Sequence, residues 1–217
     1  NITMGVSFSR SLQGGDAIDG LTVPNITAET LAQRGFDAAS LSQYLRTGTS
    51  AQGTSFGSMY TVTHFSTSAM QREDVDAIAT YLMTDKQGKL LTAAPGPEAL
   101  PIASDPLLQP GRLSYMSACA ACHGVSGEGI PNVAPPMRGN TAVMMEDPNN
   151  LVTVILHGVQ TQTFAGNERM YAMPGFADRM SAEDVAGLAT WMRAQWGAQA
   201  QPVTAEQVQK LIPKTYD

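Results

Sequence analysis

The sequence has 217 residues, a length that suits one or two domains, and its 43% apolar residues suffice for an ordinary hydrophobic core. With 15% charged residues and a net charge of −6, it lacks the basic stripe that would neutralise nucleic-acid phosphates. The longest apolar run, residues 151–156, is far too short to span a bilayer, and residues 1–5 lack the basic and apolar regions of a secretory signal.

The first predicted elements are two helices with a methionine between them. Residues 40–47 read as a helix that stops at Gly48. Residues 70–82 carry apolar side chains at i, i+3, i+4 and i+7, the spacing of an amphipathic helix. Met59 lies between the two helices in a predicted loop.

A stretch rich in proline and alanine follows and predicts a linker at residues 93–108. The linker separates a first domain, residues 1–92, from a second, residues 109–197. The remaining residues, 198–217, form a tail with one possible short helix at 203–212, for which a plain surface helix is the simplest interpretation.

The most informative segment is Cys119-Ala-Ala-Cys122-His123, which uses both cysteines of the chain and follows a predicted helix at residues 111–118. C-x-x-C-H is the attachment sequence of c-type haem. Two thiols three positions apart on a helix share a face, so each can form a thioether with one of two neighbouring vinyl groups. The imidazole of His123 then lies under the porphyrin and ligates iron.

Three other interpretations of this segment are weaker. A structural zinc site needs a fourth ligand, usually from a second Cys/His pair, and no cysteine remains to supply it. A thioredoxin-like pair would lie near a strand-helix-strand pattern, which this sequence does not show. A bare structural disulfide across two residues is unexpected in a chain of this length.

The proline-rich segment at residues 133–140 contains two candidate pocket residues. A ligating histidine needs its second ring nitrogen held by an acceptor, and the carbonyl of Pro135 in a rigid loop suits that role for His123. Met137 would then pack on the edge of the ring. The alternative is an ordinary proline-rich loop.

The elements after this segment repeat those of the first domain at an offset of 110 residues. Residues 150–157 again read as a helix that stops at a glycine, Gly158, and the following loop again carries a methionine, Met173. Residues 180–192 match 70–82, with Met, Glu, Asp, Val, Ala and Thr at identical positions, and Ser181 with Asp184 resembles a capping box.

Met173 is the preferred sixth ligand because it lies in a Pro-Gly-tightened loop and at the position that the repeat predicts. Methionine with histidine raises the reduction potential and suits electron transfer. Most methionines are packing residues. His157, at a helix end, is read as a surface or near-haem residue. Other candidates in principle are Met137, Met144, Met145, Met170 and Met180.

Residues 119–124, 134–140, 173–176 and 189–192 together resemble a class I cytochrome c domain. Residues 23–27, 44–48, 56–59, 64–67 and 78–82 resemble the middle haem domain of the multihaem cytochrome c subunits of membrane-associated bacterial dehydrogenases. The resemblance reaches to about Trp196. It implies an all-α fold of two tandem class I cytochrome c-like domains, the first truncated at its N-terminus. Met59 and Met173 match the axial methionines of that family.

The first domain departs from the family because it lacks both a C-x-x-C-H segment and the first helix. One explanation is that the sequence is a fragment, so that Met59 ligates a second haem whose cysteines and histidine lie outside it. The other is that this domain has lost its haem and become a structural docking lobe. The context of His64 suggests a structural role near the haem edge.

The resemblance implies an electron-transfer subunit rather than an enzyme. Such subunits take electrons from a flavin, quinoprotein or molybdenum dehydrogenase and pass them to a quinone or a terminal oxidase. A periplasmic protein is expected, with possible peripheral attachment to the inner membrane, because haem is attached after export. The rival from another class is a haem enzyme with an open sixth position.

Overall fold

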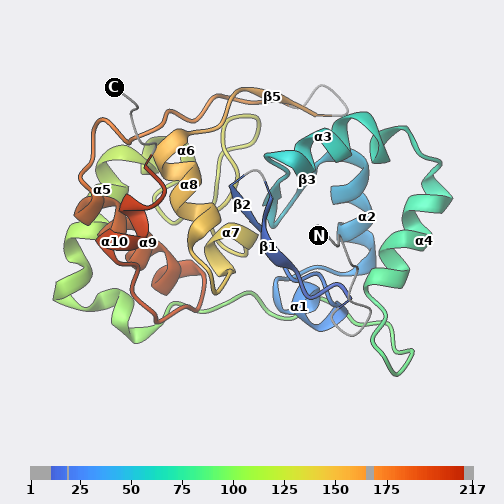
Figure 1. Cartoon of the computed structure of the whole chain (residues 1–217). Helices are drawn as coiled ribbons and strands as arrows, with labels where there is room; N and C mark the ends of the chain where they lie inside the picture. Colours follow the sequence, from blue (N-terminus) through green and yellow to red (C-terminus); the bar gives the residue numbers. More distant parts are fainter. Residues whose placement is uncertain (1–10, 19, 165–168, 213–217) are drawn as a thin grey trace, which may run out of the picture.

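A computed structural model describes residues 11–18, 20–164 and 169–212 (Figure 1). It is mostly helical, as predicted, with three small antiparallel two-stranded sheets that the sequence did not predict. The N-terminal half contains β1 (Gly15–Ile18), β2 (Leu21–Val23), α1 (Ala28–Gln33), α2 (Ala38–Thr47), β3 (Thr49–Ser50), β4 (Gly53–Thr54), α3 (Ser58–Phe65), the 3-10 turn Thr67–Ala69 and α4 (Arg72–Leu82).

The C-terminal half begins after an extended segment that carries two 3-10 turns, Pro101–Ser104 and Pro106–Leu108. Its elements are α5 (Gln109–Ala118), α6 (Ala120–His123), α7 (Thr141–Met144), α8 (Asn149–His157), β5 (Gln162–Thr163), β6 (Arg169–Met170), α9 (Ala182–Trp196) and α10 (Ala205–Gln209). None of the described helices is both long enough and apolar enough to cross a membrane.

The helix ends follow local signals in the sequence. Gly48 has a φ of +76° and ends α2, and Gly158 has a φ of +70° and ends α8, so both predicted stops are confirmed. The predicted capping box is present as well: Asp184 N donates to Ser181 Oγ (3.1 Å) and Ser181 N donates to Asp184 Oδ2 (3.2 Å).

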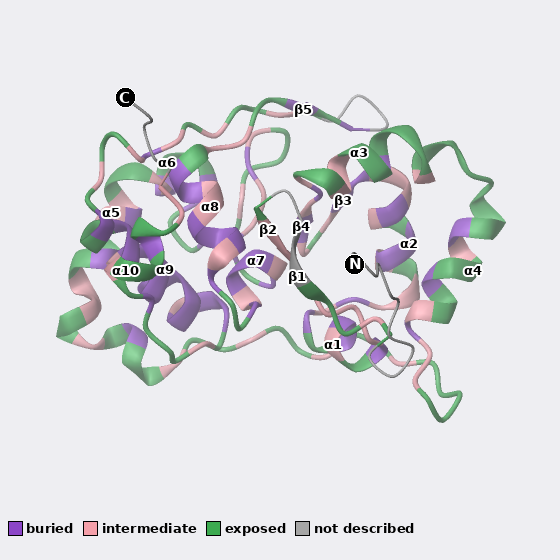
Figure 2. Ribbon diagram, viewed as in Figure 1, coloured by how far each residue is buried: buried purple, intermediate pink, exposed green. Residues whose placement is uncertain are grey.

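The buried side chains form two separate hydrophobic cores (Figure 2). One lies between α1, α2 and α4 in the N-terminal half and includes Leu41 and Val75. The other is larger and lies between α5, α8 and α9, with Tyr115 and Trp196 fully enclosed. Residues 93–100 connect them without a helix or strand.

The repeat is visible in the fold, because α8 and α9 occupy the sequence positions that match α2 and α4. One face differs between the copies. In α9, Leu188 and Trp191 are 1% and 4% exposed, since α5 packs on this helix. At the matching positions of α4, Ile78 and Tyr81 are 37% and 71% exposed. Among the described residues, no helix covers the face of α4 that corresponds to the face of α9 on which α5 packs.

The tail folds back onto the C-terminal core. Val203 and Val208 are buried, and α10 packs against α9. His157 at the end of α8 lies 3.0 Å from Leu211 O through its Nε2 atom, so this histidine contacts the tail. It lines neither of the two cavities described below.

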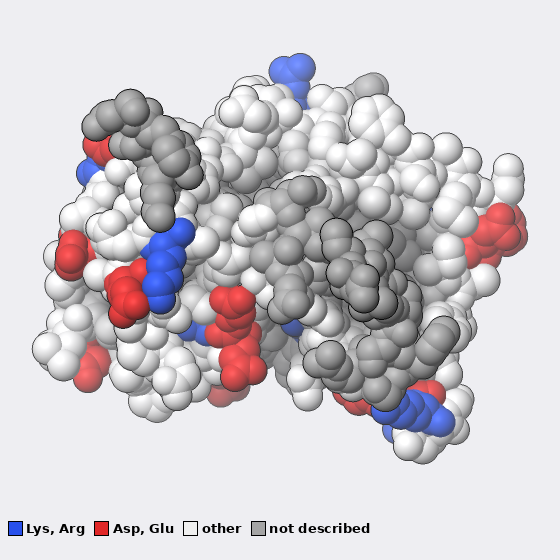
Figure 3. Space-filling model, viewed as in Figure 1, with Lys and Arg blue, Asp and Glu red and all other residues white. Residues whose placement is uncertain are grey.

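Side-chain to backbone hydrogen bonds tie the two halves together. Thr22 N in β2 donates to Asn150 Oδ1 (2.7 Å), and Asn150 Nδ2 donates to Thr22 O (2.9 Å). On the face drawn in Figure 3, charged side chains lie in small scattered groups. No continuous band of Lys and Arg crosses the part of that face that the structure describes.

Replacing Asn150 with alanine should destabilise the protein by about 1–3 kcal/mol, because it leaves the N–H and C=O of Thr22 without their partners. Chemical denaturation followed by circular dichroism measures the change. Asn149→Ala is the matched control, since Asn149 is less buried than Asn150 and bonds Gly20 O and the Thr22 hydroxyl rather than the N–H and C=O of Thr22, so it should lose less than half as much. Equal losses in the two variants would contradict the assigned role of Asn150.

Candidate functional site: two cavities with a shared wall

The C-x-x-C-H segment forms a single helical turn in the structure. Cys119 caps the end of α5, and α6 carries the rest of the segment. Cys119 and Cys122 are not joined by a disulfide, and both line one cavity of about 190 Å³. Burial, together with the smaller effect of the neighbouring Cys122, raises the pKa of the Cys119 thiol to about 11. Both sulfur atoms therefore face the same apolar cavity from one helical turn.

His123 lines the same cavity with its ring oriented by a backbone carbonyl. Its Nδ1 atom lies 2.9 Å from Pro135 O, the acceptor that the sequence analysis proposed. An N–H on Nδ1 donates to this carbonyl and leaves the lone pair of Nε2 free for a metal. Burial lowers the pKa of the imidazole below its usual value, although the Pro135 contact opposes the shift. The neutral ring is the form that ligates iron.

Tyr115 fixes the turn that follows His123 and joins α5 to α9, a role that was not predicted from the sequence. The hydroxyl of Tyr115 donates to Gly124 O (2.6 Å), directly after His123. The Tyr115 ring packs against both Trp191 and Trp196, at centroid distances of 5.3 and 4.8 Å. Tyr115 lies four positions before Cys119, but the ring cluster joins α5 to α9 and has no local sequence signal.

Met137 is buried and lines the cavity, as its predicted packing role requires. Its N–H donates to Gly127 O (2.8 Å), which fixes the proline-rich loop against the turn after His123. The loop then leads to Asn140, whose Oδ1 accepts from Ala142 N (3.0 Å) and caps α7.

Met173 lines the same cavity from a loop that is anchored on both sides. Its N–H donates to Val159 O (2.8 Å), and its carbonyl accepts from Val159 N (3.0 Å). Gly158 permits this approach, because a Cβ there would lie 2.2 Å from Met173 O. Two of the other methionines considered, Met137 and Met170, also line the cavity, and Met192 does so from α9. Met144, Met145 and Met180 do not.

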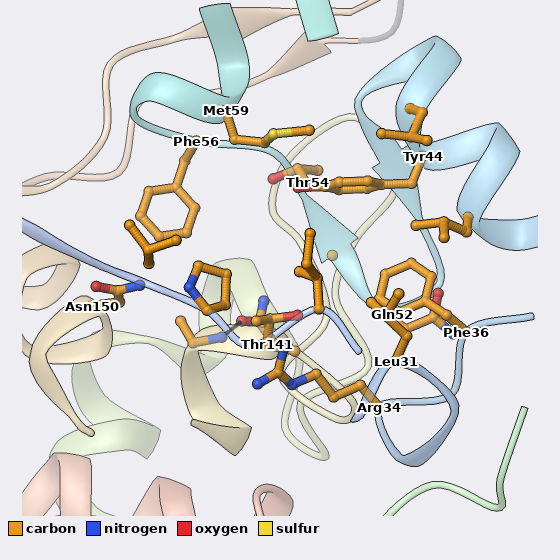
Figure 4. Close-up of a pocket in the computed structure, with 18 of the residues that line it drawn as sticks. Leu31, Arg34, Phe36, Tyr44, Gln52, Thr54, Phe56, Met59, Thr141 and Asn150 are labelled. Atoms are coloured by element: carbon orange, nitrogen blue, oxygen red, sulfur yellow. Dashed lines mark hydrogen bonds between the residues drawn. The ribbon is translucent and has the colours of Figure 1, made fainter. Parts of the chain in front are cut away.

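A second and larger cavity of about 380 Å³ lies in the N-terminal half (Figure 4). Met59, Phe56 and Tyr44 point into it. Met59 was predicted in a loop, and this was wrong: it lies in the first turn of α3, which starts at Ser58 behind Gly57. This larger cavity lies in the N-terminal half, which contains no C-x-x-C-H helix that could form one side of it.

The two cavities share a wall. Thr54, Phe56, Asn140 and Ala142 line both of them, two residues coming from each half of the chain. Phe56 also packs against the C-terminal core. This wall was not predictable from the sequence, because its members are far apart in the chain.

His64 does not line either cavity. Its Nδ1 atom lies 3.1 Å from Thr163 O, and the Tyr60 hydroxyl donates to the same carbonyl at 3.1 Å. Both side chains project from α3 onto β5, so this histidine joins the two halves.

Comparison with known proteins identifies the class that this geometry belongs to. The family model described as cytochrome c matches residues 108–196. Cytochrome c-552 of Thermus thermophilus is 32% identical over 105 residues, which is 44% of this chain and 79% of that protein. The chain belongs to the cytochrome c family and carries covalently bound haem c. The thiols, the free imidazole nitrogen and the apolar lining of the C-terminal cavity fit that group.

More extended similarity is found with the cytochrome subunits of dehydrogenases. The cytochrome c subunit of a quinone-type alcohol dehydrogenase from Komagataeibacter europaeus is 31% identical over 207 residues, which cover 92% of this chain and 44% of the relative. The gluconate 2-dehydrogenase cytochrome c subunit of Pantoea cypripedii is 29% identical over 92% of this chain and 47% of the relative. The chain thus spans about half the length of these relatives.

Proposed function

We propose that this chain relays single electrons from a partner dehydrogenase, through haem c in the C-terminal cavity, to a quinone or a terminal oxidase. The observation that carries the proposal is the convergence of Cys119, Cys122, His123 and Met173 on one apolar cavity. Cys119 and Cys122 would form the thioethers to haem, and His123 and Met173 would hold its iron. Pro135 orients His123, and Met137 packs against the ring.

Bound haem supplies one-electron exchange between ferric and ferrous iron. The chain itself would contribute a closed site, because His123 and Met173 would hold the iron and leave no position for a substrate. The Met173 sulfur and burial would keep the reduction potential high, and the Pro135 carbonyl orients the imidazole of His123. A haem enzyme would instead need the sixth position open.

The partner is proposed from the relatives, which are cytochrome subunits of alcohol, gluconate and fructose dehydrogenases. A flavin, quinoprotein or molybdenum enzyme in the periplasm, with the chain peripherally attached to the inner membrane, is the arrangement we propose. The chain produced in its own host should copurify with such an enzyme, and that enzyme's substrate should reduce the haem. Haem that stays oxidised in the presence of substrate would refute the relay.

We also propose a second haem in the N-terminal cavity, held by an attachment segment outside these 217 residues. Met59 points into this cavity, as an axial ligand requires. The open face of α4 at Ile78 and Tyr81 matches the face of α9 on which the motif-bearing α5 packs. The segment that brings the second C-x-x-C-H would cover this face and close the larger cavity.

A ferric haem peptide that carries its own Cys-x-x-Cys-His should bind the chain and produce a second methionine-to-iron charge-transfer band, additional to that of the attached haem. Met59→Ala should abolish the added band because it removes the sulfur from the cavity. Met70→Ala is the matched control, since Met70 does not line the cavity. A wild-type chain that yields no added band would favour a structural lobe with no haem of its own.

A further inference from the structure

Arg34 is a buried cation on the wall of the N-terminal cavity. It follows α1 and is 7% exposed, and its guanidinium projects toward the cavity and the start of α7 (Figure 4). Its Nη1 atom donates to Asn25 O (2.8 Å). A guanidinium has five N–H donors, and this is the one side-chain hydrogen bond that Arg34 makes within the part of the chain that the structure describes.

No carboxylate in the described ranges forms an ion pair with Arg34. Burial lowers the pKa of its guanidinium, and no acid among the residues whose side chains the structure describes opposes that shift. Burying a charge is costly unless the charge is paired and hydrogen-bonded. The cavity therefore holds a positive charge that an anionic group on an apolar ligand would compensate.

The C-terminal cavity lacks this feature. Among its described lining residues there is no Lys, Arg, Asp or Glu, and its polar members are neutral side chains such as Asn140 and Gln162. The two cavities thus share the apolar character suited to a flat ring, while only the N-terminal one places a cation at its edge.

We propose that Arg34 is the counter-ion for a propionate carboxylate of the porphyrin in the N-terminal cavity. The planar guanidinium matches a carboxylate with two parallel hydrogen bonds, and such charge-assisted bonds are strong at a buried side chain like that of Arg34. This inference rests on the proposed second haem. It adds a residue that orients the ring, since the propionate edge must face Arg34.

The test uses the chain with haem c already attached, so that its C-terminal cavity is filled. Metal-free protoporphyrin IX and its dimethyl ester are the probes, and quenching of porphyrin fluorescence reports binding. The wild type should bind the free acid roughly 10- to 100-fold more tightly than the dimethyl ester, because a charge-assisted pair contributes about that much to affinity. Arg34→Gln should abolish the preference, and Arg34→Lys should retain part of it.

Arg46→Gln is the matched control, because Arg46 lies at the end of α2 and does not line the cavity. An unchanged melting temperature of each variant shows that the fold persists. Equal preference in wild type and Arg34→Gln would overturn the role of Arg34 while leaving the cavity a porphyrin site. If neither probe binds, both this inference and a porphyrin in this cavity fall. If palmitate displaces the porphyrin at a concentration lower than that of the porphyrin, the carboxylate that pairs with Arg34 would instead belong to a lipid.

Discussion

Replacing Met173 with alanine should abolish the weak red charge-transfer band of the ferric protein and lower the reduction potential by on the order of 0.1 V, within the ~0.8 V range that axial ligands span. The reason is that the thioether sulfur of an axial methionine stabilises ferrous iron, and alanine removes it. Visible spectroscopy and a redox titration measure the two effects.

Met170→Ala is the control for this prediction. Met170 lies three residues earlier in β6 and lines the same cavity, so it loses the same volume of side chain near the ring. The charge-transfer band and the reduction potential of Met170→Ala should stay close to those of the wild type. A band that survives in Met173→Ala and disappears in Met170→Ala would transfer the ligand assignment to Met170.

Gly111→Ala should destabilise the protein by roughly 2 kcal/mol, as overpacking does, and lower the melting temperature by roughly 4–8 °C. Gly111 lies where α5 crosses α9, and a Cβ there would stand 2.3 Å from Gly187 O and 3.0 Å from the Cβ of Trp191. The helices must separate to accept it. Because α5 carries Cys119 at its end, we also expect less haem to be attached.

Gly187→Ala provides the matched comparison on the opposite helix. A Cβ at Gly187 would meet nothing within 4 Å, so the substitution should be neutral or stabilise by up to about 1 kcal/mol through helix propensity. Thermal unfolding of both variants, with the haem content of each, decides the matter. Equal destabilisation by the two alanines would show that the crossing is not the tight contact described.

The sequence was sufficient wherever a signal was local. The stops at Gly48 and Gly158 and the capping box at Ser181 depend on residues within one turn, and each was predicted correctly. The C-x-x-C-H spacing likewise determines a single turn, so the cavity-facing placement of Cys119 and His123 followed from the motif alone.

The sequence was insufficient wherever contacts join distant segments. The pairing of Thr22 with Asn150 spans 128 positions, and neither residue type indicates which residue it will pair with. The two-residue strands are too short for an alternating pattern to show. The helical position of Met59 was missed because α3 begins behind a glycine and has no capping side chain.

The wall formed by Thr54, Phe56, Asn140 and Ala142 gives the two cavities a common dielectric boundary. With the proposed haem on each side of this wall, the charge on one iron would act on the other through protein, which screens less than bulk water. The two centres would then titrate as a coupled pair, and the measured midpoints would belong to the pair and not to either iron. A variant in one half of the chain is therefore expected to move both midpoints.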